Sequence, residues 1–434
     1  MDEGDRLKPQ DERKKPMQPQ TERHTGNPVS THVLMHADEI IAVAHRESNS
    51  VDVKLPEKLP FGLRTASLDY VDFMRWLDRR TDNLQRTYMN KVYIARKVGR
   101  ELNNILRDSC ALSVTDQFWI NRSDMPDMTW SKLQEKRDQN ETLVNVALTG
   151  NTAYLDWEAA LQGTTSLFAL KGQFPKAIRG NVLLKRGGTQ EREWVASVIG
   201  EALNLPVQKA VILSPAEPSG KDDALVSIEL FTNENNSLVH ASELFSNAPD
   251  YSESCAVGQQ HRYFYDQLPN DALKYEFERV LILNWLISNH DMHGENFGCL
   301  YDPNTFEIKN ITPSFDHNSA DFDGTTPDFD VPGIVIPSLA RHNDVIEKIK
   351  SGELETAVNS IGDWLTDEQK NGIKTVGQEL LDEYERGRNQ SASVKLPAAD
   401  TNAKNGTSEN RYFNPPNLTL PSSSISEESL ELGG

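Results

Sequence analysis

The chain has 434 residues, of which 37% are hydrophobic, and its 65 acidic residues against 45 basic ones give a formal net charge of −20. This length suits two or three domains, and the hydrophobic content is enough to fill their cores. The acidic excess disfavours binding to a phosphate backbone, so we expect no direct nucleic-acid partner. The cysteines form no CxxC pair, which argues against a disulfide framework or a cysteine zinc site; they are Cys110, Cys255 and Cys299.

Both ends of the chain are polar. Residues 1–30 are charged, rich in proline and without periodic apolar positions, so we expect a disordered tail. Residues 387–434 are rich in Asn, Ser, Pro, Lys and Ala, and we expect a second disordered tail there. Because no apolar run approaches eighteen residues and the start lacks a signal-peptide core, we expect neither a membrane span nor a standard secretory signal.

Residues 31–160 are predicted to form an additional N-terminal α+β region of unknown role. Short runs of strand type come first, namely HVLMHA, EIIAVAHRE and VDVKL. Helical stretches follow, namely SLDYVDFMRWLDRR and YMNKVYIARKVGREL.

Residues 161–240 combine a loop, a strand and a helix. Small and polar residues around Gly172 precede an apolar strand that ends at Lys185, and the next helix carries Glu193 in its first turn. A nucleotide site needs a loop whose backbone approaches phosphates, a cation on them and a carboxylate that holds the cation. A lysine at a strand end is more commonly a solvated surface residue, so this segment alone leaves both readings open. We expect one face of the helix to carry Trp194, Val198 and Leu203.

Residues 271–289 are apolar around much of a helical circumference, which predicts a buried helix. Its end leads into the polar loop HDMHGEN, which contains Asp291 and Asn296. Two strand-like runs follow, FGCLYD and FEIKNITPSFD, and we expect the second to end on Asp316. Such a hairpin can bring Asp316 beside the loop. A carboxylate near an acceptor hydroxyl, with an asparagine and a second carboxylate as oxygen ligands of Mg²⁺, is the arrangement of phosphoryl transfer.

These motifs resemble those of the HipA-like kinase family. The catalytic loop of that family, N-x-D-x-H-x-x-N, is similar to residues 289–296, and its P-x-[FY]-D element is similar to residues 313–316. Its G-x-x-x-K element is similar to residues 172–176, and its glutamate helix is similar to residues 193–205. Together these matches cover about 165–320, and the combination is more specific than any one piece.

The resemblance implies a fold and a reaction. The fold is α+β, two-lobed and protein-kinase-like, with an N-lobe at 161–240 and a mainly helical C-lobe at 241–386. The implied activity is that of a serine/threonine-protein kinase, which uses ATP and Mg²⁺ to phosphorylate a protein substrate of unknown identity. An antitoxin-like or regulatory partner is compatible with it. The implied location is the bacterial cytoplasm, with a secreted effector that acts in a host cytosol as the alternative.

The resemblance also assigns roles to single residues. Asp291 is the expected catalytic base, and Asn296 and Asp316 are the expected metal ligands and belong to the catalytic set. Lys185 is expected to contact the ATP phosphates, with Glu193 as its partner. The remaining ATP-binding positions are Gly172 and Lys176 in the loop, and Glu229 and Phe231 in a hinge that presents backbone groups to adenine.

Two other functions stay open. In a metallohydrolase, His290, Asp291 and His293 would gather with Asp316 or His317 around zinc or manganese, because imidazole suits transition metals. A nucleotide-binding pseudokinase scaffold would bind ATP without turnover. The hydrolase hypothesis gives no role to Lys185, Glu193 and Asn296.

Overall fold

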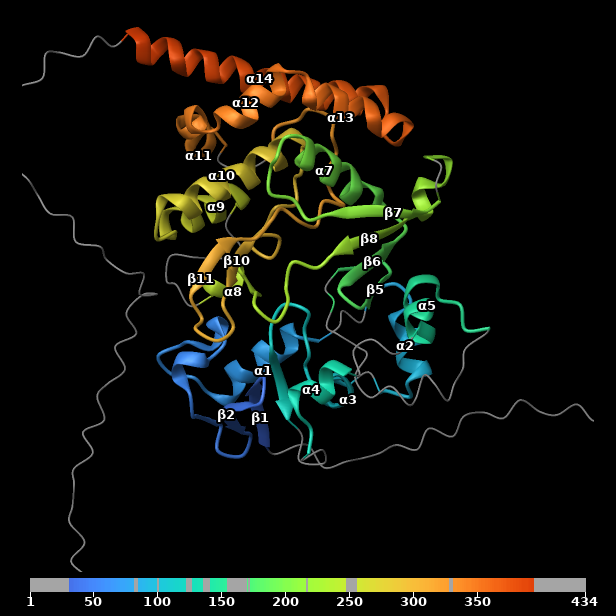
Figure 1. The fold of residues 1–434 in the computed structure, drawn as a ribbon. Coiled ribbons are helices and arrows are strands. Elements are labelled where there is room, and N and C mark those ends of the chain that lie inside the picture. Colours follow the sequence, from blue (N-terminus) through green and yellow to red (C-terminus); the bar gives the residue numbers. More distant parts are fainter. Residues whose placement is uncertain are drawn as a thin grey trace, which may run out of the picture.

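The structure is a computed structural model that describes residues 31–81, 85–99, 101–121, 127–135, 141–153, 170, 172–215, 218–246, 256–327 and 331–393. The expected tail at 1–30 lies outside these residues, as does 394–434 of the expected C-terminal tail. The fold is α+β, as predicted, with sheets in its first two thirds and helices toward the C-terminus (Figure 1). Within the described ranges, no helix is long and apolar enough to cross a membrane.

The N-terminal region is built on an antiparallel sheet of order β3-β2-β1-β4. Helix α1 (Tyr70–Arg79) begins at Asp69, whose carboxylate accepts a hydrogen bond from the Asp72 N–H, as an N-cap residue does. The three strands and the helix that the sequence predicted are present. The strands are β1 (Thr31–His36), β2 (Glu39–His45), β3 (Ser50–Val53) and β4 (Phe118–Asn121).

Short helices complete this region. The expected helical stretch at 88–102 is divided, because Lys97 adopts a left-handed backbone with φ of 55° that a continuous helix does not allow. Helix α2 therefore ends before this residue and α3 begins after it. The helices are α2 (Met89–Ala95), α3 (Leu102–Ser109), α4 (Trp130–Glu135) and α5 (Glu141–Thr149).

A second antiparallel sheet, of order β5-β6-β8-β7, follows. Helix α7 (Glu191–Ala202) buries Val195 and Ile199, whereas Trp194 is only partly buried and packs on Trp364 with ring centroids 5.8 Å apart. Of the three residues expected on one helical face, Trp194 and Val198 are partly buried and Leu203 is buried. The strands are β5 (Lys176–Arg179), β6 (Val182–Arg186), β7 (Ala210–Ser214) and β8 (Leu225–Glu229).

A third sheet joins the two halves of the chain. Strand β9 (Ser237–His240) pairs with β10 (Gly298–Tyr301), which pairs with β11 (Ile308–Ile311). Strand β9 lies before the expected lobe boundary at 240, yet it belongs to the sheet of the later hairpin. Strand β11 ends before Asp316, so this residue follows the hairpin instead of ending it.

Helices form the C-terminal part. Helix α10 (Asp271–Leu286) is capped by Asn270, whose Oδ1 accepts from the Leu273 N–H at 3.0 Å, and nearly all of its second half is buried, as predicted. Helix α14 (Asp367–Ser393) continues past residue 387, where we expected the tail to begin. The others are α8 (Ala241–Leu244), α9 (Val257–Gln267), α11 (Val331–Ser338), α12 (Asn343–Lys350) and α13 (Glu353–Ile361).

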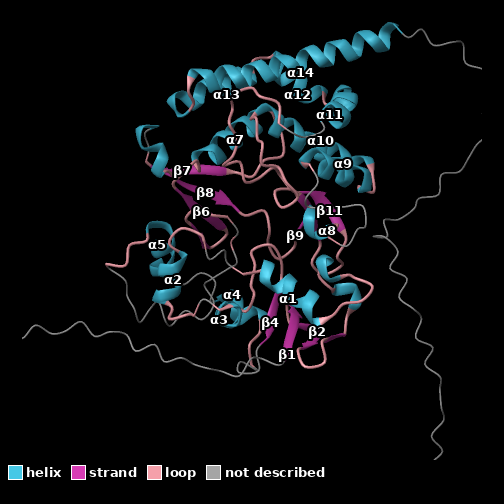
Figure 2. Ribbon diagram, turned by 180° about the vertical axis from the view of Figure 1, so that it is seen from behind, coloured by secondary structure: helices cyan, strands magenta, loops and turns pink. Residues whose placement is uncertain are grey.

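The parts share one hydrophobic core. It includes Leu34 of β1, Phe73 of α1, Ile199 of α7, Phe277 of α10 and Val376 of α14. The C-terminal helices lie at one end of the molecule and the N-terminal sheet at the other, with the two remaining sheets between them (Figures 1 and 2). This arrangement brings the N-terminal region, the β5–β8 sheet and the β9–β11 sheet to a common centre.

Candidate active site

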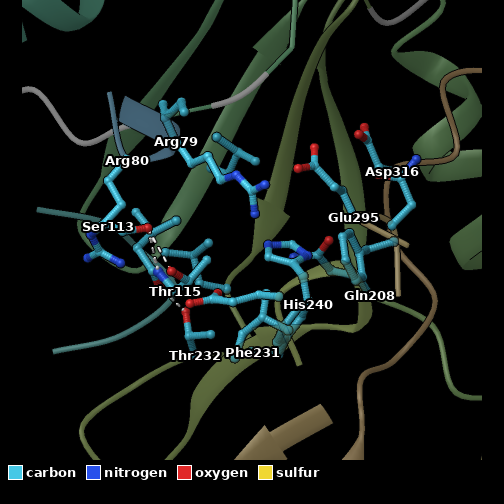
Figure 3. Close-up of a pocket in the computed structure, with 18 of the residues that line it drawn as sticks. Arg79, Arg80, Ser113, Thr115, Gln208, Phe231, Thr232, His240, Glu295 and Asp316 are labelled. Carbon is cyan, nitrogen blue, oxygen red and sulfur yellow. Dashed lines mark hydrogen bonds between the residues drawn. The ribbon is translucent and has the colours of Figure 1, made fainter. Parts of the chain in front are cut away.

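A cavity of about 210 Å³ lies at this centre (Figure 3). Its walls come from all three parts of the chain. The β5–β8 sheet and the segment after β8 contribute Lys176, Leu183, Lys185, Leu230, Phe231 and Thr232, and the C-terminal half contributes Asn296, Phe315 and Asp316 among others.

Lys185 of β6 forms the charged centre of the cavity. Its Nζ donates to Glu193 Oε1 at 2.5 Å and to Asp316 Oδ1 at 2.7 Å, and its side chain is 6% exposed. Burial lowers the pKa of this lysine, but the two carboxylates outweigh burial and hold the pKa above its ordinary value. Lys185 is therefore a fixed cation shared by two carboxylates, and the expected pairing with Glu193 is present.

Glu193 lies in the first turn of α7 and is 2% exposed. Burial raises the pKa of its carboxyl, whereas Lys185 and His317 lower it, and the net shift is downward. Its second oxygen, Oε2, accepts from the His317 backbone N–H at 3.0 Å and lies 3.2 Å from His317 Nδ1. Both oxygens of this buried carboxylate are thus engaged, and the group stays ionised.

The glycine loop lies against a second lysine. Burial and the neighbouring charge of Lys185 lower the pKa of Lys176 to about 8. Gly172 has φ of +99°, and a Cβ atom built there would lie 2.6 Å from Lys176 Nζ. A side chain at this position would displace the Lys176 ammonium group, and the positive φ itself favours glycine. The loop is tied to the N-terminal region, because Gln173 O accepts from the Thr87 N–H at 2.9 Å.

Asp291 is placed by its own loop. Its N–H donates to Asn289 Oδ1 at 3.2 Å, and its carbonyl oxygen accepts from Asn296 Nδ2 at 2.6 Å. Its side chain is 47% exposed and accepts from Ser319 Oγ at 3.3 Å. Asn296 lines the cavity and Asp291 does not, so the asparagine amide links the backbone of Asp291 to the cavity wall.

Asp316 reaches Lys185 through an irregular segment. Ser314 N–H donates to Pro206 O at 2.9 Å, and Gln208 N–H donates to Ser314 O at 2.9 Å, which fastens the segment to the connection between α7 and β7. Asp316 then adopts a left-handed backbone with φ of 60°, which aspartate tolerates better than most residues. Burial raises the pKa of the Asp316 carboxyl, but the charge of Lys185 lowers this pKa by more, and the net shift is downward.

Glu229, one of the two expected hinge positions, lies outside the cavity. This residue is exposed and does not line the cavity, and its backbone belongs to the sheet: its N–H donates to Lys209 O at 3.0 Å, and its carbonyl accepts from Gln208 Nε2 at 2.9 Å. Phe231 does line the cavity and packs against Phe315, with ring centroids 5.5 Å apart. Of the two expected hinge positions, Phe231 therefore lies at the cavity and Glu229 lies in the sheet.

The N-terminal region contributes residues that the sequence patterns did not indicate. Arg80 is a structural residue, because its guanidinium binds both oxygens of Asp116 at 2.7 and 2.8 Å in a buried pair. Arg79 instead extends toward His240 and Glu295 across the cavity (Figure 3). No local pattern could have found these residues, because tertiary packing brings them to the cavity. The region also supplies Trp76, Ser113, Val114 and Thr115.

The histidines of the metallohydrolase hypothesis do not converge. His290 Nε2 lies 2.9 Å from Thr325 Oγ1, and His293 Nε2 lies 3.6 Å from Asp291 Oδ1. His317 is fully buried, and its two ring nitrogens are hydrogen-bonded to Ser314 and Glu193. Among the residues described, no three His, Cys, Asp or Glu side chains are grouped so that they could hold a metal ion.

The donors on the cavity wall suit magnesium with a triphosphate. Asn296 and Asp316 both line the cavity and offer amide and carboxylate oxygens. Since Asn296 Nδ2 is engaged with a carbonyl, Oδ1 is the atom of this amide that can coordinate. Mg²⁺ is usually held by one or two such protein ligands, with water and phosphate oxygens as the others. Lys176 and Lys185 lie on the same wall and can compensate phosphate charge.

No protein-family model matches the chain, and no curated protein does. Among solved structures, the chain is similar to the Helicobacter pylori proinflammatory kinase CtkA, with 18% identity over 50% of this chain and 94% of that one and a TM-score of 0.37. It is also similar to the HipA toxin of Shewanella oneidensis in its complex with HipB and operator DNA, with 14% identity, coverage of 84% and 100%, and a TM-score of 0.48. Both solved structures are of HipA-like kinases, the family whose motifs this sequence resembles.

Proposed function

We propose that this chain is a HipA-like serine/threonine-protein kinase, which uses ATP and Mg²⁺ to phosphorylate a hydroxyl group of a protein. One observation supports this most: Lys185 binds both Glu193 and Asp316 on the wall of a cavity that Asn296 also lines. A lysine fixed by a helix glutamate, beside two oxygen ligands, is the set of residues that phosphoryl transfer from ATP requires.

The lysines and the apolar wall would bind the nucleotide. Lys185 and Lys176 would lie against the phosphates, since both are cations on the cavity wall. The purine would contact the apolar side formed by Leu183, Leu230 and Phe231. Mg²⁺ held by Asn296 and Asp316 would supply the positive charge that offsets the charge of the transferred group.

Asp291 would act on the acceptor. Its carboxylate is about half exposed, so a substrate hydroxyl can reach it. Its backbone is held at both its N–H and its carbonyl, which fixes the point from which the side chain extends. The carboxylate would orient the hydroxyl and accept its proton as the oxygen attacks the terminal phosphorus. Because every role in the reaction has a residue, an active kinase is favoured over a pseudokinase scaffold.

Labelled ATP and a cell lysate test this proposal. The purified chain is incubated with γ-labelled ATP and Mg²⁺ in the lysate, and labelled proteins are identified by mass spectrometry, with Asp291→Asn in parallel. We expect label on Ser or Thr residues with the wild type and not with the variant. Binding of Mg·ATP is measured separately by calorimetry. Binding without label transfer would support the scaffold, and absence of both would refute the nucleotide site.

A further inference from the structure

We propose that His317 is a positioning residue, which joins the catalytic loop to the Lys185–Glu193 pair through one buried chain of hydrogen bonds. This inference rests on the proposed function, because it concerns the same site. The chain of bonds passes through Asp291, Asn289, Asn284, Ser314, His317, Glu193 and Lys185.

The first half of the chain leads from the catalytic loop to helix α10. Asp291 N–H donates to Asn289 Oδ1 at 3.2 Å, and Asn289 Nδ2 donates to Asn284 Oδ1 at 2.7 Å. Asn284 Nδ2 donates both to Val280 O at 2.8 Å and to Ser314 Oγ at 2.7 Å. The Asn284 oxygen thus accepts from one amide, and its nitrogen donates to two oxygens. These bonds fix which way the amide group is turned.

The second half leads to the nucleotide lysine. Ser314 Oγ lies 2.8 Å from His317 Nε2, and His317 Nδ1 lies 3.2 Å from Glu193 Oε2. An ionised carboxylate only accepts hydrogen bonds, so Nδ1 carries the proton. In the neutral form of the ring, Nε2 accepts from the Ser314 hydroxyl, whose oxygen accepts from Asn284. The donors therefore all point the same way, from the Asp291 N–H to Glu193, and such aligned bonds strengthen one another.

The contacts of Ser314, His317 and Glu193 are also those of a nucleophilic triad. The burial of these side chains rules out that role. Ser314 is 2% exposed and His317 is fully buried, and neither lines the cavity. The hydroxyl oxygen of Ser314 is occupied by the Asn284 amide, so no acyl group can reach it. The three residues position the site and do not attack a substrate.

His317 determines which oxygen of Glu193 is left for the lysine. The ring and the backbone N–H of His317 both lie at Oε2, which leaves Oε1 to Lys185. Without the ring, one hydrogen bond holds Oε2 and the carboxylate can turn, so Lys185 is directed less firmly at the phosphates. Because the chain continues to Asp291, the same change loosens the catalytic loop. We expect the affinity for Mg·ATP and kcat to fall together.

The test compares His317 with a second buried histidine. His342 is fully buried and its Nε2 lies 2.8 Å from Glu278 Oε2, but Glu278 is bonded to Tyr265 and Arg341 instead of Lys185. Calorimetry gives the Kd of Mg·ATP, phosphoryl transfer gives KM and kcat, and heating gives the melting temperature. Both His317→Ala and His342→Ala should melt earlier than the wild type. Only His317→Ala should weaken Mg·ATP binding, on the order of tenfold, as the loss of a hydrogen bond to a charged group does.

Rescue separates positioning from simple packing. In His317→Asn the amide nitrogen occupies the place of Nδ1 along the side chain and can donate to Glu193, so we expect most of the Mg·ATP affinity to return. In Ser314→Ala the His317 ring loses its other partner, and we expect a smaller loss of Mg·ATP affinity. This variant also tests the proposal if His317→Ala does not fold.

Three results decide the proposal. Wild-type affinity in both His317→Ala and Ser314→Ala would overturn it, and so would an equal loss of affinity in His342→Ala. If the wild type itself neither bound Mg·ATP nor transferred phosphate, the proposed function would fail instead, and the two failures are therefore distinct.

Discussion

The ammonium group of Lys185 lies 2.7 Å from the carboxylate of Asp316, which joins a strand of the β5–β8 sheet directly to the segment after the β9–β11 sheet. The same ammonium group binds Glu193 at 2.5 Å. One buried cation therefore compensates two carboxylates that come from different parts of the fold.

Lys185→Ala should destabilise the protein strongly. It leaves Glu193 buried without its counter-charge, and breaking a buried pair costs about 3 kcal/mol or more. Urea unfolding at neutral pH measures this loss. Lys54→Ala is the control, because the Lys54 side chain is 51% exposed in its pair with Asp52 and exposed pairs contribute about 0–1 kcal/mol. Equal free energies of unfolding for the two variants would show that Lys185 does not hold the site together.

The stability supplied by Glu193 should depend on pH. Its folded pKa is below its ordinary value of 4.5, so its contribution is complete above that value and is lost as the pH falls toward the folded pKa. Glu193→Gln should therefore be less stable than the wild type at pH 7, and the difference should shrink below about pH 4.5. Unfolding free energies of both proteins between pH 7 and pH 3 test this. A difference that grew on acidification would contradict the pairing.

Two glycines with positive φ offer a matched test of the loop. Gly172→Ala and Gly180→Ala both place a side chain in a left-handed backbone, which costs about 1–2 kcal/mol. Only at Gly172 does the new Cβ meet Lys176 Nζ, since nothing lies within 4 Å at Gly180. We expect similar losses of stability, but a several-fold higher KM for ATP only in Gly172→Ala. Equal KM values would remove the loop from the nucleotide site.

The sequence predicted the features that lie within short segments well, and the features that depend on tertiary packing poorly. Periodicity and spacing within short segments can be read from the sequence. They predicted the buried helix α10, the loop from Asp291 to Asn296 and the strand that carries Lys185. The hinge register at Glu229 depends on which strand the segment pairs with, and strand ends are not visible in composition. From the sequence His317 was indicated only as a metal ligand of the hydrolase hypothesis, because its partner Glu193 is 124 residues away along the chain.

The contribution of the N-terminal region to the cavity could not be predicted for the same reason. Its strands and first helix were predicted, but nothing local indicates that α1 reaches a cavity formed by much later residues. Trp76 Nε1 donates to Glu243 at 3.1 Å, and Phe118 packs on Phe306 with ring centroids 6.1 Å apart. These contacts fix the region against the C-terminal half and place Arg79 at the cavity. Only the packing of the whole chain gives these residues their position.

Asp291→Asn should reduce kcat by on the order of 10² or more and leave the Kd of Mg·ATP nearly unchanged, because the carboxylate acts on the acceptor proton. Asp344→Asn is a suitable control, since the Asp344 side chain is 44% exposed and pairs with Arg279 away from the cavity. Steady-state kinetics and calorimetry give the two constants. Wild-type turnover in Asp291→Asn would remove this residue from the reaction.

The dependence of ATP binding on Mg²⁺ tests the site most directly. If Asn296 and Asp316 hold Mg²⁺ against the phosphates, ATP should raise the melting temperature much more with Mg²⁺ than with EDTA. Asp316→Ala should abolish that difference, whereas His293→Ala, which the metallohydrolase hypothesis makes a ligand, should keep most of it. The contradicting result is a melting temperature of the wild type that is indifferent to Mg²⁺ and ATP, together with bound zinc that His293→Ala loses.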